Sequence, residues 1–397
     1  MHLNLINKQL KNDNFLRLIA GCLVFPAYID FFISKSPVWQ GLAYLTYTVP
    51  LAILFMNSRV HLNLRQIGFW LFFLSLWIVP SLINLNSGRL ESDRIIIHAL
   101  TAKLFFLTVI IIFAKSFFQH FKEGDFSQLM VYILTAYLPM ILIIFLESID
   151  LSIACHFCRV KPFNNLAFFV SELFYLFIIV CLPLKNQSVK ICLILLGFLG
   201  VIMVEGRAAL IASLIAIIIF VFYSKKSNKV FKILIVASLF LTLFALIFHF
   251  QFVVTIINDT FIYRYKGNLE SLSNRIHMYN LAIESIRHYP WLGIGFEVTP
   301  SYYSFLDHNV NVVHNFILRI ATENGLPVAL VILAILTIAV VRMIRYRMPF
   351  ELAFLVSFII FNSFSTRHLS LNLMNVLLYI IIVKAFMTYK RRQSRPA

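Results

Sequence analysis

The sequence predicts an all-α, polytopic integral membrane protein with about twelve transmembrane helices. Hydrophobic residues make up 60% of the chain and charged residues 13%, against about 25% charged residues in an ordinary globular protein. Apolar runs follow one another along the whole chain, separated by short polar connectors. A helix needs about 20 mostly apolar residues to cross a hydrocarbon core of about 30 Å. The runs show no period-2 alternation, which excludes a transmembrane β-barrel.

We expect each apolar run to form one transmembrane helix, because unpaired backbone groups are not tolerated in hydrocarbon. The first run has no small-residue cleavage site, so we interpret it as a membrane anchor and not as a removed signal peptide. The expected helices lie near residues 14–34, 38–56, 66–85, 96–119, 127–147, 164–184, 188–205, 207–223, 230–252, 316–342, 349–365 and 369–388.

The distribution of basic residues predicts the orientation of these helices. Lys185, Lys190, Arg342, Arg345 and Arg347 are among many lysines and arginines in alternate connectors. This positive-inside pattern predicts that both termini are cytoplasmic. It also accounts for most of the net charge of +17, so we do not expect a nucleic acid partner.

The predicted helices and their orientation divide the chain into four regions. The expected organisation is N-terminal transmembrane helices over 1–189, further transmembrane helices over 190–252, one large periplasmic loop over 253–315, and C-terminal transmembrane helices with a basic tail over 316–397.

Several basic residues fall on the predicted periplasmic side, where topology does not need them. They are Arg89, Arg94, Arg159, Lys161, Arg207, Arg264, Lys266, Arg275, Arg287, Arg367 and His368. Arg207 opens a transmembrane segment directly after Glu205-Gly206. A charge at that depth is costly unless it is paired or faces a water-filled cavity, so it indicates a functional site. The alternative is an interfacial arginine paired with Glu205.

The predicted periplasmic loop contains an amphipathic helix. Ile276, Tyr279, Leu281, Ile283 and Ile286 lie near helical spacing. Ser273 is a plausible N-cap, and Pro290 with Gly293 and Gly295 would end the helix. His314 and Asn315 stand at the membrane boundary, at or just before the start of the tenth span.

Three segments together resemble the O-antigen ligase and polymerase superfamily. They are G-R-A-A-L-I-A at 206–212, N-R-I-H-M-Y-N-L-A-I-E-S-I-R-H-Y-P-W-L-G-I-G-F at 274–296, and H-N-F-I-L-R-I-A-T-E-N-G-L-P-V-A-L at 314–330. The usual tryptophan of the second motif is replaced here by Met278 or Tyr279, and Pro327 stands near the second glycine of the third. The resemblance covers about residues 190–345.

The resemblance implies a metal-independent, inverting glycosyltransferase with a GT-C-like fold in the bacterial inner membrane, with its active site facing the periplasm. The donor would be a glycan on undecaprenyl pyrophosphate. The acceptor would be lipid A–core in a ligase, which we favour, or a lipid-linked repeat unit in a polymerase. We expect no cofactor and no metal, since the sequence shows no outward D-x-D or paired carboxylates.

The resemblance also assigns roles to individual residues. His314 would be the general base, because histidine titrates near neutral pH. Arg207 and Arg275 would hold the pyrophosphate, whose oxygens a guanidinium binds bidentately. Asn315 would cap the tenth helix or orient His314, and Glu323 would hold a neighbouring arginine or stand on the helix surface. Less central candidates for binding glycan or shaping the loop are Arg264, Arg287, Asp307, His308 and Arg367.

Two alternatives stay open at this point. A lipid-linked oligosaccharide flippase or other transporter would have internal repeats and polar groups at the bilayer midplane, and the sequence shows neither. Cys155 and Cys158 lie in a predicted outer loop, where a disulfide is permitted; a redox or metal role is the less favoured reading.

Overall fold

The computed structural model describes residues 2–28, 45–46, 48–49, 108–119, 121, 123–154, 167–204, 207–224, 277–295, 315–363 and 373–393. Within these ranges the regular elements are all helices, which agrees with the predicted all-α class. The labelled helices are α1 (His2–Tyr28), α6 (Glu123–Ala154), α7 (Ala167–Cys181), α8 (Gln187–Met203), α9 (Arg207–Tyr223), α14 (Phe316–Asn324), α15 (Leu326–Arg345), α16 (Pro349–Asn362) and α17 (Leu373–Gln393). Two further helices span Thr108–Gln119 and 277–288.

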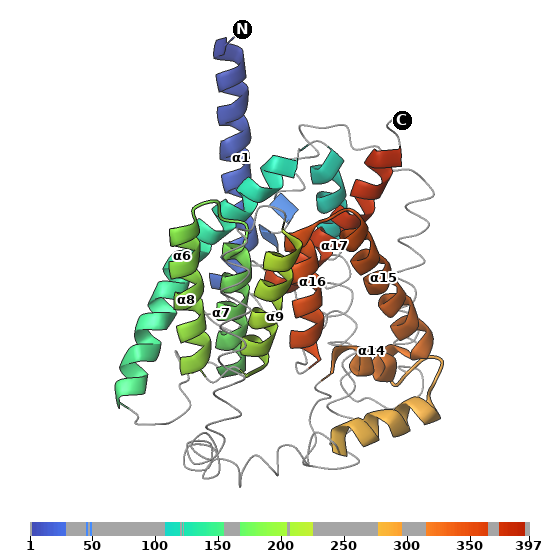
Figure 1. The fold of residues 1–397 in the computed structure, drawn as a ribbon. Coiled ribbons are helices and arrows are strands. Elements are labelled where there is room, and N and C mark those ends of the chain that lie inside the picture. Colours follow the sequence, from blue (N-terminus) through green and yellow to red (C-terminus); the bar gives the residue numbers. More distant parts are fainter. Residues whose placement is uncertain are drawn as a thin grey trace.

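The centre of the bundle is α7, which packs against α6, α8 and α9 (Figure 1). From Val170 to Cys181 its side chains are buried, as expected for a mostly apolar helix at the centre of a bundle. Gly197 and Gly200 of α8 stand directly against Ile178 and Phe174 of α7. Small residues at such contacts let two helix backbones approach closely, which is how membrane helices commonly pack.

α16 joins this centre to the C-terminal helices. It packs along α9 and also contacts α15 and α17. The rings of Tyr175 and Phe361 stack with centroids 5.0 Å apart, and the Tyr175 hydroxyl is 2.7 Å from Ser357 Oγ. On the other side of α16, Lys384 of α17 pairs with Glu351. These four buried polar side chains are thus paired, as a low-dielectric interior requires.

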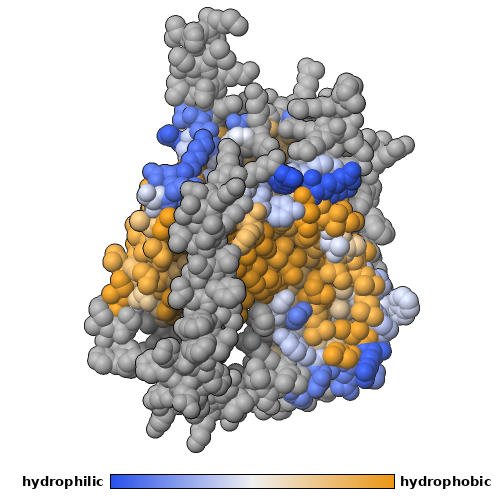
Figure 2. All heavy atoms as spheres, viewed as in Figure 1, coloured by the Kyte–Doolittle hydropathy of each residue, from blue (hydrophilic) through white to orange (hydrophobic). Residues whose placement is uncertain are grey.

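The outer surface of the bundle is suited to lipid. Figure 2 shows a band of apolar side chains between polar rims. Helices Gly124–Ile149 and Leu326–Arg345 are long and apolar enough to cross a membrane, and six shorter apolar helices accompany them in the described residues. Only 28% of the most apolar window of Leu326–Arg345 is buried inside the protein. An apolar helix with this much outward surface is matched to hydrocarbon and not to water.

Several predicted spans agree closely with the helices. Residues 188–205, 207–223, 349–365 and 369–388 correspond to α8, α9, α16 and α17 within a few residues. The first span begins earlier than predicted, at His2. The spans near 38–56, 66–85 and 230–252 lie largely or wholly outside the described residues, so the number twelve stays a prediction.

The prediction of one continuous tenth helix over 316–342 is wrong. The chain forms the short α14, breaks at Gly325, and starts again as α15. Gly325 has φ +87°, outside the helical region, and Pro327 lies in the first turn of α15, where its missing N–H costs nothing. α14 has 9 residues, about 13 Å of helix, which is too short to cross a bilayer.

α1 begins and α17 ends at the same end of the bundle, at the top of Figure 1. The opposite end carries α14 and the helix 277–288. The candidate functional site lies at that second end.

Candidate functional site

α14 begins at an N-cap that follows His314 directly in the chain. Asn315 has extended backbone angles, φ −152° and ψ 120°, and its side-chain oxygen accepts a hydrogen bond of 3.0 Å from the Leu318 N–H. The cap satisfies one of the free N–H groups at the helix start. The prediction that Asn315 caps this helix is therefore confirmed.

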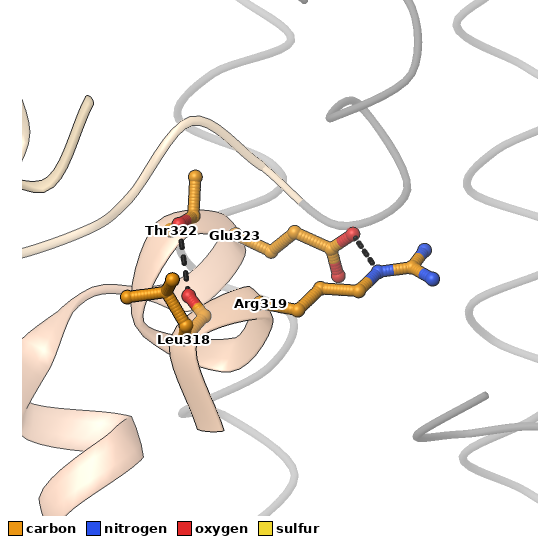
Figure 3. Close-up of polar contacts among 4 residues, drawn as sticks. All are labelled: Leu318, Arg319, Thr322 and Glu323. Carbon is orange, nitrogen blue, oxygen red and sulfur yellow. Dashed lines mark hydrogen bonds and ion pairs between the residues drawn. The ribbon is translucent and has the colours of Figure 1, made fainter. Parts of the chain in front are cut away.

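A buried ion pair lies one turn further along α14. Arg319 Nε donates a 2.7 Å hydrogen bond to Glu323 Oε1 (Figure 3). Glu323 is 0% exposed and Arg319 9%, so the reading of Glu323 as a surface acid is excluded. Figure 3 also shows Thr322, whose hydroxyl donates to the Leu318 carbonyl at 2.8 Å. Glu323 therefore holds a neighbouring arginine, which is one of the two roles predicted for it.

The segment after the helix 277–288 is fixed to the end of α14 by backbone hydrogen bonds. The N–H groups of Ile294 and Gly295 donate to the carbonyls of Thr322 (2.8 Å) and Glu323 (2.9 Å). The Leu326 N–H donates to the Pro290 carbonyl at 2.8 Å. We call these contacts between residues 290–295 and 322–326 the loop latch.

Two glycines make the loop latch possible. Gly293 has φ +65° and Gly325 φ +87°, values that side chains with a Cβ rarely adopt. A Cβ on Gly293 would lie 2.5 Å from the Glu323 carbonyl carbon, and one on Gly325 would lie 2.5 Å from the Trp291 carbonyl carbon. The W-L-G-I-G and E-N-G parts of the two motifs therefore touch through their backbones, each needing glycine at the contact.

The helix 277–288 has one face against the protein and one face outward. Ala282 is buried and packs with Met278, Tyr279, Leu281 and Leu318 of α14. The helix ends at residue 288, just before Pro290, Gly293 and Gly295, which were predicted to end it. Ile283 departs from the predicted apolar stripe, since it is 43% exposed. Arg287 is exposed on the same outward face.

α9 brings the first motif to the same end of the molecule. It begins at Arg207, and this start of α9 lies at the lower end of the bundle in Figure 1. α9 packs along α16, and the ring of Phe358 in α16 meets Phe316 of α14 with centroids 6.1 Å apart. The starts of α9 and α14 and the helix 277–288 thus lie at one end.

Several predicted residues fall outside the described residues. They are His314, Arg275, Arg264, Arg367, Asp307, His308, Cys155 and Cys158. For Arg207 the structure gives the backbone, at the start of α9, and not the side chain. The structure thus describes the side chains of Asn315, Glu323 and Arg287. Over the same ranges no group of three or more His, Cys, Asp or Glu side chains is arranged to hold a metal ion.

Two buried polar residues of α14, Arg319 and Asn324, were not predicted from the sequence. Asn324 is 0% exposed, and neither amide atom has a hydrogen-bond partner in the described part of the chain. A signal for Arg319 was present, since an acid four residues after an arginine favours an i,i+4 pair on a helix. No comparable signal pointed to Asn324.

A family model described as "O-Antigen ligase" matches residues 192–333. The match supports the O-antigen ligase superfamily as the family that this part of the chain resembles. The matched residues run from α8 through α9, the helix 277–288 and the loop latch to the first part of α15. No curated protein matches the chain.

Similarity to the O-antigen ligase superfamily over residues 192–333 supports a coarse functional assignment. The members are integral membrane proteins, in agreement with the apolar helices described above. The match supports glycosyltransferase-like activity of the ligase or polymerase type, with lipid-linked glycan substrates and a lipid acceptor.

Proposed function

We propose that this protein is an O-antigen ligase-type glycosyltransferase, which moves a glycan from undecaprenyl pyrophosphate to lipid A–core. The transfer takes place at the periplasmic face of the bacterial inner membrane. The loop latch is the observation that carries the proposal. It joins the segment that follows Arg275 to the segment that follows His314, within the residues that match the O-antigen ligase superfamily.

The reaction in this proposal is a single inverting displacement. A hydroxyl oxygen of the acceptor sugar bonds to C1 of the donor sugar, and the bond from C1 to the phosphate oxygen breaks. Undecaprenyl pyrophosphate leaves with the electron pair of that bond, and His314 accepts the hydroxyl proton. A positioned general base contributes about 10²–10⁴-fold to such a step.

Arg207 and Arg275 hold the pyrophosphate in this mechanism. Arginine stays charged at all relevant pH values and its planar fork matches phosphate oxygens. Arg207 opens α9, so the free N–H groups of that helix start also favour an anion. The two arginines stabilise the charge that grows on the leaving group, and no metal or other cofactor is needed.

The remaining predicted residues support this arrangement. Asn315 fixes the start of α14 next to His314, and Glu323 fixes Arg319 one turn away. Arg264, Arg287 and Arg367 bind glycan or shape the loop.

The test uses purified full-length protein, undecaprenyl-pyrophosphate-linked glycan and a metal chelator. Lipid A–core and a second lipid-linked repeat unit serve as separate acceptors. We compare the wild type with His314→Ala, Arg207→Ala and Arg275→Ala. Arg345→Ala is the matched control, because Arg345 is an exposed arginine in the last turn of α15, at the opposite end of the bundle.

We expect the wild type and Arg345→Ala to transfer glycan to lipid A–core with chelator present. His314→Ala and both arginine variants should lose about 10²-fold or more of the rate. Chain growth on the lipid-linked unit instead would make the protein a polymerase with the same chemistry. A folded wild-type protein that transfers glycan to neither acceptor would overturn the enzyme proposal and favour a transporter. Loss of a transporter would trap the donor on the cytoplasmic leaflet.

A further inference from the structure

The outward face of the helix 277–288 lines an open cavity of about 550 Å³. Among the described residues, its lining consists of Asn280, Ile283, Glu284, Arg287 and His288. They recur at helical spacing, so they form one face of the helix, and each is exposed. The last lies eight positions after the first, which is about 12 Å along the helix axis. We call this face the polar groove.

The polar groove carries both kinds of hydrogen-bonding group. Arg287 offers only donors, the Glu284 carboxylate only acceptors, and Asn280 and His288 offer both. Glu284 and Arg287 stand three residues apart, yet in the described part of the chain neither takes part in an ion pair. Their polar atoms are therefore available to a ligand without first breaking a salt bridge.

This mixture of groups indicates the class of ligand. Sugar hydroxyls donate and accept, so a saccharide uses all four polar side chains, and Ile283 gives its C–H surface an apolar contact. A phosphate would meet the repulsive Glu284 carboxylate beside Arg287. A lipid chain would leave four polar side chains without partners. The cavity volume also lies within the range of about 300–1,000 Å³ that is common for small-ligand sites.

The position of the helix fits the same class of ligand. The helix lies at the end of the bundle, beyond α14 and the start of α15 (Figure 1). Its inner face packs on Leu318 of α14, and the loop latch fixes its C-terminal end. The glycan of a lipid-linked substrate projects from the membrane surface into water, so it would pass this end of the molecule.

We propose that the polar groove is a saccharide-binding site that holds the glycan chain of a substrate beside the transfer site. The proposal rests on the proposed function, since that function supplies the glycan. The saccharide comes from either the donor or the acceptor, and the experiment separates these two sources.

The kinetic test compares Asn280→Ala, Glu284→Ala, Arg287→Ala and the double variant Asn280→Ala/Glu284→Ala with the wild type. The matched controls are Arg345→Ala and Gln187→Ala, both exposed at the opposite end of the bundle. Donor concentration is varied at saturating acceptor, and acceptor concentration at saturating donor. In each single variant we expect KM for one substrate to rise about three- to tenfold, because one or two hydrogen bonds to the saccharide are lost. We expect kcat to stay within about twofold of the wild-type value.

A rise in KM for the donor alone assigns the polar groove to the donor glycan, and a rise for the acceptor alone assigns it to the acceptor. Unchanged KM for both substrates in the double variant would overturn the proposal. A lower kcat at constant KM would also overturn it, since that result means a role in the transfer step and not in glycan binding.

A second measurement does not depend on transfer. Saturation-transfer NMR records binding of two free probes to the full-length protein: the saccharide released from the donor by mild acid, and the saccharide released from lipid A–core. The wild type and both controls should bind one probe, and the double variant should lose that signal. Binding of a probe without any glycan transfer would support the saccharide-binding site and reject the proposed function. Glycan transfer without binding of either probe would support the proposed function and reject the saccharide-binding site.

Discussion

Among single residues, Arg319 and Glu323 place two opposite charges in the buried part of α14. Both are buried, and the pair joins Arg319 Nε to Glu323 Oε1 at 2.7 Å. Taking two charges out of water is costly, so such a pair adds little net stability compared with apolar residues of similar volume. Removing one partner is different, because the other charge stays buried without compensation.

This asymmetry gives a prediction for Glu323. Glu323→Gln should destabilise the protein by about 3–5 kcal/mol and lower the melting temperature in detergent. The double variant Arg319→Met/Glu323→Leu, which removes both charges, should have a melting temperature close to that of the wild type. A Glu323→Gln protein that melts with the wild type would contradict the prediction.

The same double variant separates stability from function. If the pair only holds α14 together, the stable double variant transfers glycan at the wild-type rate. If Arg319 also acts on substrate, the double variant is stable and its transfer is slow. The readout is the transfer assay on protein whose melting temperature has been restored.

Among the helices, α14 shows best what sequence patterns predict and what they miss. The pattern of 316–342 is apolar almost throughout, and hydropathy alone predicts one long helix there. The break between α14 and α15 depends on the backbone of Gly325, which has φ +87°. Because Gly325 has no Cβ, the Trp291 carbonyl can lie directly against it. A partner 34 residues earlier in the chain decides this geometry, so local propensity does not report it.

Other elements were predictable because their signals are local. α9 begins at Arg207 and ends at Tyr223, as its hydropathy predicts, and Asn315 caps α14 as its residue type predicts. The motifs around Gly293 and Gly325 were recognised as patterns, but their mutual backbone hydrogen bonds were not. Long-range pairing of two loops leaves no periodicity in the sequence.

The loop latch leads to a prediction for Gly325. Gly325→Ala places a Cβ against the Trp291 carbonyl at a positive φ, so the segment 290–295 should detach from α14. We expect faster proteolysis within 277–295 and slower glycan transfer. Gly21→Ala is the matched control, because Gly21 lies within α1 and has nothing within 4 Å of an added Cβ. There alanine should raise stability by up to about 1 kcal/mol.

Limited proteolysis of membrane-embedded protein, followed by mass spectrometry of the fragments, measures this effect. Equal cleavage rates in Gly325→Ala and the wild type would mean that the loop latch does not hold the helix 277–288.

At the scale of the whole molecule, one group of basic side chains lies at the end of the bundle opposite the candidate site. Lys185 lies between α7 and α8, and Arg342, Arg345 and Arg347 lie at the end of α15, at the end where α1 begins. The helix 277–288 lies at the other end. If the positive-inside rule holds here, the first end is cytoplasmic and the polar groove is periplasmic.

Cysteine labelling tests this orientation. In a chain whose native cysteines are replaced by serine, we introduce Glu284→Cys at one end and Gln187→Cys at the other, both at exposed positions. A membrane-impermeant maleimide should label Glu284→Cys in intact spheroplasts and Gln187→Cys only after the inner membrane is opened. The reverse pattern would place the loop latch and the polar groove in the cytoplasm. A glycan carried by undecaprenyl pyrophosphate on the periplasmic leaflet could not then reach them, and the proposed ligase reaction would be excluded.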